Sequence, residues 1–350
     1  MKTIEVKASR SYNVHIGSDL LPQIGAQTRS TVGGRIAAII SDDRVWPLYG
    51  NTVLSSLKNA GYEVCHFVFP AGEMQKNAQI LLSILNFLAE NGLTRSDVIL
   101  ALGGGVAGDI TGFAASIYLR GIAYIQIPTT LLAMVDSSVG GKTAIDLPAG
   151  KNLVGAFYQP SLVLCDVNTL QTLPEDIFLD GCAEVIKYAI LYDPPLFRLL
   201  CETKQAFPRE EVVAKCIQWK RDVVARDEFD KGARQLLNLG HTIGHSVEAN
   251  SDFAISHGLG VAIGTAIVTR AACHFGVCTE ETRDQILSIL SDFGFPITTG
   301  YSAASLFDYA QTDKKRFGNT IHLIVPKAIG DCVIHNTPID ELESFIKAGL

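Results

Sequence analysis

Asp97-Val-Ile-Leu-Ala-Leu-Gly103-Gly104-Gly105-Val-Ala-Gly108-Asp109 is an apolar run that ends in three glycines and continues as a helical pattern. Gly103, Gly105 and Gly108 match the G-x-G-x-x-G spacing, in which backbone N–H groups and a helix N-terminus approach a pyrophosphate. The usual acidic partner of the ribose does not follow about 20 residues later; the candidate lies upstream, in Ser41-Asp42-Asp43. The stretch predicts a strand, a turn and a helix that bind a dinucleotide, with a purely structural tight turn as the alternative.

Strand-like and helical segments alternate around this turn. Residues 2–16 alternate as two short strands, and strand-like runs follow at 35–40, 63–69, 98–102 and 124–127. Helical patterns such as 76–90 lie between these runs. This alternation predicts a parallel, doubly wound sheet whose ligands bind at the carboxyl ends of its strands.

The pattern becomes mostly helical after about residue 172. Helical patterns cover 181–192, 209–226, 232–248, 259–275 and 280–291, and a hairpin-like pair follows at 320–325 and 331–335. We place the domain boundary near residue 171, because Pro174 could open the first helix of a new domain. The chain is thus predicted to be α/β, with an α/β domain at residues 1–171 and an α-helical domain at 172–350.

The composition is that of a globular protein without nucleic-acid or membrane partners. Of the 350 residues, 47% are hydrophobic and 19% are charged, and the net charge is −7. Lys and Arg do not gather into the extended basic patch that nucleic acids and anionic membranes require. Eight cysteines without a C-x-x-C pair, and no apolar signal core or membrane span, predict a reduced cytoplasmic protein.

Residues 128–152 combine small hydroxyls, paired glycines, two lysines and an amide. They include Pro128-Thr129-Thr130, Asp136, Gly140-Gly141-Lys142 and Gly150-Lys151-Asn152. In a loop-rich region, such side chains suit capture of phosphate or nucleotide ribose. A surface loop is the alternative, which the strongly apolar flanks disfavour.

Two acid–base pairs stand three residues apart at predicted helices. Glu73 and Lys76 stand at a helix start, where simple capping would explain them. Glu184 and Lys187 share one face of the first helix of the second domain, where an ion pair is the ordinary interpretation. Glu184 together with His241 and His257 would instead provide the carboxylate and two imidazoles typical of catalytic zinc.

A polar helix face is predicted in the stretch Arg234-Gln-Leu-Leu-Asn238-Leu-Gly-His241-Thr-Ile-Gly-His245. These four polar residues follow the i, i+4, i+7, i+11 progression of one face of a helix. A guanidinium, an amide and two imidazoles suit the binding of a metal and an anion. Taken alone, a solvated face that happens to contain histidines would be the simpler interpretation, but the other stretches favour a site.

Together these stretches resemble the 3-dehydroquinate synthase family of sugar-phosphate cyclases. The resemblance spans nearly the whole chain, and its motifs include Gly-Lys151-Asn152-Leu-Val-Gly-Ala-Phe, Ala-Glu184-Val-Ile-Lys187-Tyr, Leu-Leu-Asn238-Leu-Gly-His241-Thr-Ile-Gly-His245 and His257-Gly. It implies a Rossmann-like NAD-binding domain followed by a helical metal and substrate domain. It also implies an enzyme that converts 3-deoxy-D-arabino-heptulosonate 7-phosphate into 3-dehydroquinate and phosphate.

The resemblance implies a role for each residue that matches a motif. The implied ligands of a divalent metal, zinc or cobalt, are Glu184, His241 and His257. The implied NAD-binding residues are Asp42, Glu73, Lys76, Gly103, Gly104, Gly105, Asp109, Thr129, Thr130, Lys142, Lys151, Thr169 and Leu170. The implied substrate-binding and catalytic residues are Asp136, Lys142, Asn152, Lys187, Lys220, Arg234, Asn238, His245 and Lys314, and Arg120 is expected to reach the neighbouring active site of a homodimer.

The implied chemistry explains these residue types. NAD⁺ oxidises the C5 hydroxyl, and the metal polarises the new carbonyl, so that the adjacent C–H becomes acidic and phosphate leaves. NADH then returns the hydride, the ring opens and an intramolecular aldol reaction closes the carbocycle. Because the substrate is a flexible anion, the protein needs Lys, Arg, Asn and His to hold one conformer.

The sequence departs from the family pattern at several positions. Asp230 stands where a glutamate is usual, and Met134 stands where a glutamine is. After His257-Gly the usual Glu-Ala is Leu259-Gly260, which removes a possible acid near the metal. Asp146-Leu147 replaces a common Asn-His. These departures affect the expected rate and substrate preference more than the reaction class.

Three alternatives stay open at this level. A metal-dependent polyol dehydrogenase of the glycerol dehydrogenase type would share the fold, but it has no need of the anion-binding set that includes Lys142, Arg234 and His245. Relatives that cyclise other sugar phosphates are closer, and Arg234, Asn238 and His245 favour a substrate with a carboxylate. A non-catalytic metal- and nucleotide-binding relative is the third alternative.

Overall fold

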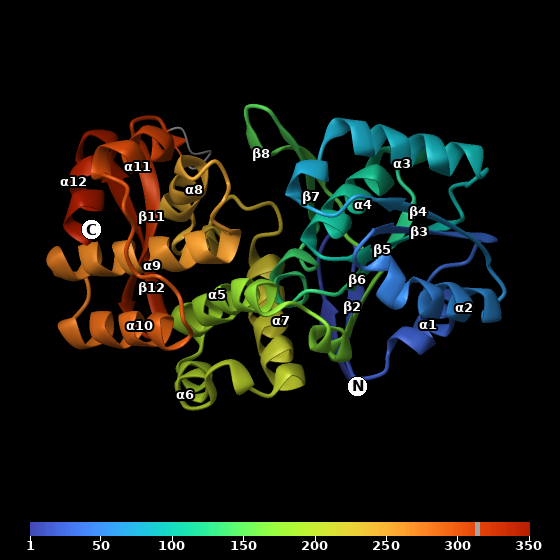
Figure 1. The fold of residues 1–350 in the computed structure, drawn as a ribbon, viewed down its shortest axis with the longest axis horizontal. Coiled ribbons are helices and arrows are strands. Elements are labelled where there is room, and N and C mark those ends of the chain that lie inside the picture. The colour runs from blue at the N-terminus through green and yellow to red at the C-terminus, as the bar shows by residue number, and fades with distance from the viewer. Residues whose placement is uncertain (312–315) are drawn as a thin grey trace. The chain divides into compact units, whose positions relative to one another are not determined.

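The computed structural model describes residues 1–311 and 316–350, which form two compact units (Figure 1). The first unit contains Met1–Pro174 and Arg209–Phe229, and the second contains Glu175–Pro208 and Asp230–Leu350. In the described part of the chain, no helix has the length and hydropathy needed to cross a membrane.

The first unit is built on a seven-stranded sheet in the order β1-β2-β9-β6-β5-β3-β4. Its strands are β1 (Lys2–Val6), β2 (Tyr12–Gly17), β3 (Ile36–Asp42), β4 (Glu63–Phe69), β5 (Val98–Gly103), β6 (Ala123–Pro128) and β9 (Leu162–Asp166). The β1–β2 pair is antiparallel and the other neighbours pair in parallel, which confirms the predicted sheet type. The strand order reverses between β3 and β5, because β4 follows on the outer side of β3 and β6 follows on the outer side of β5.

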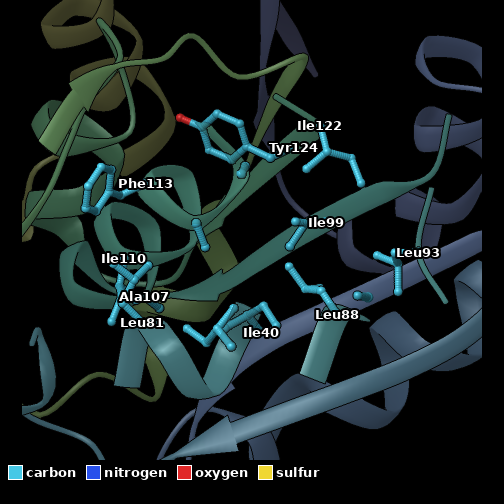
Figure 2. Packing of buried hydrophobic residues seen from close by; sticks show 14 of the residues in the cluster. Ile40, Leu81, Leu88, Leu93, Ile99, Ala107, Ile110, Phe113, Ile122 and Tyr124 are labelled. Atoms are coloured by element: carbon cyan, nitrogen blue, oxygen red, sulfur yellow. The ribbon is translucent and has the colours of Figure 1, made fainter. Parts of the chain in front are cut away.

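Strand β3 shows why helices cover both faces of this sheet. Ile36, Ala38 and Ile40 enter one apolar cluster, and the alternate residues Ala37 and Ile39 enter another. The first cluster includes side chains of α3 (Ala78–Glu90) and α4 (Gly105–Ile117), and the second includes side chains of α1 (Ile24–Thr31) and α2 (Asn51–Asn59). Figure 2 shows the first cluster, and Figure 1 shows the two helix pairs on opposite sides of β3, β4 and β5.

Helix α7 (Arg209–Arg226) belongs to the first unit, although the predicted boundary at residue 171 assigns it to the second. Its bounds are those predicted from periodicity, and it packs against β1, β2 and the short helix η5 (Ala133–Ser137). Val213 and Ile217 of this helix are fully buried. Periodicity identifies the apolar face of a helix but not the element that covers it, so the sequence pattern left the partner undetermined.

Residues 142–157 form a hairpin rather than the loop-rich region that the composition predicted. Strands β7 (Lys142–Leu147) and β8 (Gly150–Phe157) pair antiparallel. Buried residues alternate along β7, where Thr143 and Ile145 are buried, but β8 shows no such alternation because most of it is exposed. The glycines and lysines of this segment therefore predicted loops, and no signal in the sequence indicated the two strands.

The second unit is mostly helical, as predicted. Its helices are α5 (Glu175–Tyr192), α6 (Pro194–Thr203), α8 (His241–Asn250), α9 (His257–His274), α10 (Glu280–Asp292), α11 (Ala303–Ala310) and α12 (Ile339–Gly349). Strands β10 (Arg316–Phe317), β11 (Thr320–Ala328) and β12 (Asp331–Pro338) form an antiparallel sheet that includes the predicted hairpin.

The helix predicted at 232–248 is interrupted. A short 3-10 helix, η8 (Ala233–Asn238), ends before Leu239, and α8 begins at His241. Gly240 separates them with a φ of +77°, and a Cβ there would lie 2.5 Å from the Val261 carbonyl oxygen. Arg234 and Asn238 therefore do not share one helix face with His241, because the chain must turn where Gly240 meets α9.

Candidate active site

Two histidines and a glutamate meet in the second unit. Glu184 comes from α5, His241 is the first residue of α8, and His257 is the first residue of α9. The Nε2 atoms of His241 and His257 each lie 3.5 Å from Glu184 Oε1. One ligand atom from each residue falls within 4.8 Å of the others, and Glu184 is 1% exposed. A buried carboxylate and two imidazoles fit a divalent metal and match the ligand types of catalytic zinc sites.

Hydrogen bonds to the Nδ1 atoms orient both imidazoles. His241 Nδ1 lies 3.0 Å from the Leu239 carbonyl oxygen, and His257 Nδ1 lies 3.0 Å from Glu248 Oε1. Burial lowers the pKa of His257, but hydrogen bonds to Glu184 and Glu248 outweigh that effect and raise the pKa to about 10.

Glycines bring α8 and α9 close enough to place the two histidines together. A Cβ on Gly264 would lie 2.0 Å from the Gly240 carbonyl oxygen, and one on Gly244 would lie 2.7 Å from the Gly260 carbonyl oxygen. The backbones therefore touch, which only glycine permits at these positions. Asp180 of α5 accepts a hydrogen bond from the Gly258 N–H at 2.5 Å and so holds the first turn of α9.

Other predicted site residues of the second unit surround these helices. Lys187 is 2% exposed and forms an ion pair with Glu184, so this pair has its ordinary ion-pair role while Glu184 also belongs to the candidate metal-ligand set. The His245 ring centroid lies 5.6 Å from that of His241 and 5.8 Å from that of His257. Arg234 is 2% exposed, and Asn238 Nδ2 donates to the Gln235 carbonyl oxygen. Lys314 lies outside the described residues.

The predicted nucleotide site lies where the strand order of the first sheet reverses. Asp42 ends β3, and Gly103 ends the neighbouring β5. A Cβ on Gly103 would lie 3.3 Å from Asp42 Oδ2, and one on Gly104 would lie 3.0 Å from Thr130 Cγ2. Helix α4 begins at Gly105, so its N-terminus faces the same end of the sheet. Dinucleotides bind at such reversal points in open parallel sheets.

Lys76 connects several predicted residues of the first unit. Its Nζ lies 2.6 Å from Asp109 Oδ2 and 4.0 Å from Glu73 Oε1, and donates to Asn152 Oδ1 at 2.5 Å. Burial lowers the pKa of Lys76, but Asp109 and Glu73 outweigh that effect and raise the pKa. Asp146, one of the departures from the family pattern, accepts a hydrogen bond from the Asn152 N–H at 2.7 Å.

The remaining predicted residues of the first unit are less concentrated. Lys220 Nζ lies 3.0 Å from Asp136 Oδ1 and donates a hydrogen bond to the main-chain carbonyl oxygen of Asp136 at 2.5 Å. These contacts link α7 to η5. Thr129, Thr169 and Leu170 are buried, Lys151 is half-buried, and Lys142 and Arg120 are exposed.

Glu248 lies near the candidate metal ligands and was not predicted from the sequence. It is 1% exposed and stands seven residues after His241 and three after His245. Continuing the helical progression past His245 could have found it, because these positions share one face of α8. Asp180 gave no comparable signal, since its partner is the backbone of a residue 78 positions away.

Comparisons with known proteins agree over nearly the whole chain. Residues 66–180 match the family described as 3-dehydroquinate synthase N-terminal, and residues 181–316 match that described as 3-dehydroquinate synthase C-terminal. The chain is 42% identical over 352 residues to a 3-dehydroquinate synthase of Enterococcus faecalis (99% of this chain, 98% of the relative). It is 43% identical over 341 residues to one of Pelobacter propionicus (95% of each).

A solved structure supports the same fold. It is a 2-epi-5-epi-valiolone synthase from Streptomyces hygroscopicus subsp. jinggangensis with NAD⁺ and Zn²⁺ bound, and it matches with a TM-score of 0.89 and 27% identity. The match covers 99% of this chain and 98% of that chain.

Proposed function

The chain belongs to the 3-dehydroquinate synthase family, and we propose that its two clusters hold NAD and one divalent metal ion for the reaction of that family. The reaction converts 3-deoxy-D-arabino-heptulosonate 7-phosphate into 3-dehydroquinate and inorganic phosphate, a step of aromatic amino acid biosynthesis. The observation that carries the metal proposal is the meeting of Glu184, His241 and His257 within 4.8 Å. We infer that the enzyme is a phosphate-eliminating lyase and that it acts in the cytoplasm.

The NAD proposal rests on the first sheet. Asp42 would bind the adenosine ribose, and the backbone of Gly103–Gly105 with the N-terminus of α4 would bind the pyrophosphate. When bound, NAD and the metal supply hydride transfer at C5 and polarisation of the carbonyl that this transfer creates. The structure of the valiolone synthase, with NAD⁺ and Zn²⁺ bound, supports this pair of groups.

The side chains of this enzyme would bind and orient the anionic substrate. Arg234 would hold its carboxylate, since a guanidinium forms paired hydrogen bonds to that group. The other proposed substrate-binding residues are Asp136, Lys142, Asn152, Lys187, Lys220, Asn238, His245 and Lys314. Their work is to hold one conformer while bonds to hydrogen and phosphate break.

We further propose a homodimer in which Arg120 serves the neighbouring active site. Arg120 is exposed at the end of the short helix η4 (Tyr118–Arg120). Leu119 and Arg120 have φ values of 51° and 66°, a left-handed backbone conformation that residues other than glycine rarely adopt. Such strain is found at functional sites, where the surroundings hold it in place.

The test is phosphate release from 3-deoxy-D-arabino-heptulosonate 7-phosphate by the purified enzyme with NAD⁺, with and without chelator, while NADH absorbance is followed. We expect chelator-sensitive phosphate release without accumulating NADH, because the hydride is returned. Stoichiometric NADH from a polyol without phosphate release would instead indicate a dehydrogenase. Absence of both activities would direct the assay to other sugar phosphates.

A further inference from the structure

His257 is held between two buried carboxylates. Its Nε2 faces Glu184 Oε1 at 3.5 Å, and its Nδ1 faces Glu248 Oε1 at 3.0 Å. Glu184 and Glu248 are each 1% exposed. An ionised carboxylate can only accept a hydrogen bond, so the contact with Glu248 places a proton on Nδ1, and Nε2 is the nitrogen that faces Glu184 and His241 and that a metal bound there would use.

The helix pair is shaped so that Glu248 can reach this position. A Cβ on Gly260 would lie 3.0 Å from Glu248 Cγ, so a larger residue there would press on the side chain. The position expected to carry an acid after His257-Gly is Leu259 in this chain. The carboxylate that contacts His257 Nδ1 thus comes from Glu248 of α8 and not from the residue after His257-Gly on α9.

We propose that Glu248 is a positioning residue that fixes the tautomer and orientation of His257 for metal binding, an inference that rests on the metal site of the proposed function. A carboxylate on the far nitrogen of a metal-binding histidine sets which nitrogen binds the metal and makes the imidazole a stronger ligand. Glu248 does not touch the substrate in this role and acts through His257.

A second arrangement is the main competitor. His245, Glu248 and His257 also bring ligand atoms within 4.8 Å of one another, so Glu248 itself could be a metal ligand. If His257 bound a metal in this set through Nδ1, the metal would have to replace the hydrogen bond between Nδ1 and Glu248. The 3.0 Å hydrogen bond occupies that nitrogen with a proton and favours the positioning role.

The experiment compares zinc binding by the metal-stripped full-length wild type with that by Glu248→Ala and Glu248→Gln, using competition with a chromophoric chelator. The cobalt(II) absorption spectrum of each protein reports the ligand geometry, and thermal melting of the metal-free proteins reports the fold. His257→Ala is the reference for a lost ligand. Asp193→Asn is the matched control, because Asp193 is another buried carboxylate of the second unit that accepts a hydrogen bond, from the Leu196 N–H.

We expect one zinc per chain in the wild type and an affinity reduced about 10- to 100-fold in Glu248→Ala. Glu248→Gln should lose less zinc affinity than Glu248→Ala, because an amide oxygen can accept the same hydrogen bond without the charge. If Glu248→Ala does not fold, the zinc affinity of Glu248→Gln tests the proposal. Asp193→Asn should bind zinc like the wild type.

The possible contrary results are distinct. Unchanged zinc affinity in both Glu248 variants would overturn the positioning role, as would an equal loss in Asp193→Asn. Two zinc ions in the wild type, of which Glu248→Ala loses one, would make Glu248 a ligand and also overturn it. A wild type that binds no zinc or cobalt would overturn the metal proposal itself.

Discussion

Arg234 carries a permanently charged guanidinium and is 2% exposed. A buried guanidinium binds a carboxylate through paired, charge-assisted hydrogen bonds. The substrate of the family reaction carries a carboxylate, which we propose Arg234 binds. The residue is therefore a direct test of the proposed substrate contacts.

We predict that Arg234→Ala lowers kcat/KM by about 100-fold or more, since loss of a buried charged hydrogen-bonding partner costs about 3 kcal/mol and each tenfold in rate corresponds to ~1.4 kcal/mol. NAD affinity, measured by fluorescence titration, should stay within about twofold, because the proposed NAD residues belong to the first unit. Arg234→Lys keeps the positive charge but lacks the planar guanidinium that forms paired hydrogen bonds. Its kcat/KM should therefore lie between those of the wild type and Arg234→Ala. Unchanged kcat/KM in Arg234→Ala would contradict the proposed carboxylate contact.

Asp97 performs a structural task at the residue scale. Its Oδ1 accepts hydrogen bonds from the Arg35 and Ile36 N–H groups at 2.8 and 2.7 Å, and its Oδ2 accepts two from Thr94 at 2.8 Å. Burial raises the pKa of Asp97, but these hydrogen bonds outweigh that effect and lower the pKa below its ordinary value of 3.8. The ionised carboxylate thus ties the start of β3 to the turn before β5.

We predict that Asp97→Asn lowers the free energy of unfolding by about 2 kcal/mol at pH 7, because an amide cannot accept all four hydrogen bonds. A depressed pKa contributes stability above the unfolded-state pKa and loses it as the pH falls toward the folded-state pKa. The difference between wild type and variant should therefore shrink below about pH 4. Urea unfolding at several pH values measures this, with the exposed Asp43→Asn as control; a difference that grows on acidification would refute the assignment.

Single residues also show where sequence reasoning reached its limit. The residue types of Glu184, His241 and His257 suggested a metal before the fold was known, and the structure brings them together. The predicted polar face ends at His245 and does not include Glu248, which lies one helical turn further along the same face of α8. Asp97 carried no signal at all, since an acid before a strand does not reveal which backbone groups it will meet.

At the scale of elements, hydrophobic periodicity gave the bounds of β4 and α7 and the existence of most other helices and strands. It failed where one residue overrides the pattern. Gly240 ends the predicted helix 232–248, because close contact with α9 demands a glycine and a turn there. The sequences Gly240-His-Thr-Ile-Gly244 and Gly260-Val-Ala-Ile-Gly264 carried this information, since glycines four apart on two helices permit close backbone contact.

We predict that Gly264→Ala destabilises the enzyme and weakens zinc binding. Alanine favours a helix by about 1 kcal/mol over glycine, but its Cβ would lie 2.0 Å from the Gly240 carbonyl oxygen, which no side-chain rotation can relieve. Forcing α8 and α9 apart should cost about 1–3 kcal/mol net of that gain and move His241 away from His257. Chemical unfolding and zinc competition measure both effects.

Gly300→Ala is the matched control, because a Cβ at Gly300 would have no atom within 4 Å. That variant should retain wild-type stability and zinc affinity. If Gly264→Ala were as stable as the wild type, the backbone contact between α8 and α9 would not be as close as the structure has it.

At the scale of the whole molecule, the chain contributes to its two units in turn. It completes most of the first unit by Pro174, builds α5 and α6 of the second, returns to the first for α7, and then completes the second. A boundary drawn once in the sequence cannot describe this arrangement. The composition change near residue 171 predicted the start of the helical part, but the return of α7 depends on the apolar surface of β1, β2 and η5.

This return implies that a core substitution in α7 should loosen the first unit rather than the helical unit that follows it in sequence. Ile217 is fully buried, so Ile217→Ala should lower the stability of its surroundings by about 2–5 kcal/mol through lost burial and an unfilled cavity. Hydrogen exchange followed by mass spectrometry should show faster exchange in β1, β2 and η5, with α9 and β11 unchanged. Ile286→Ala, an equally buried isoleucine on α10, should give the opposite pattern. Faster exchange of α9 and β11 in Ile217→Ala would instead place α7 with the second unit, as the boundary at residue 171 predicts.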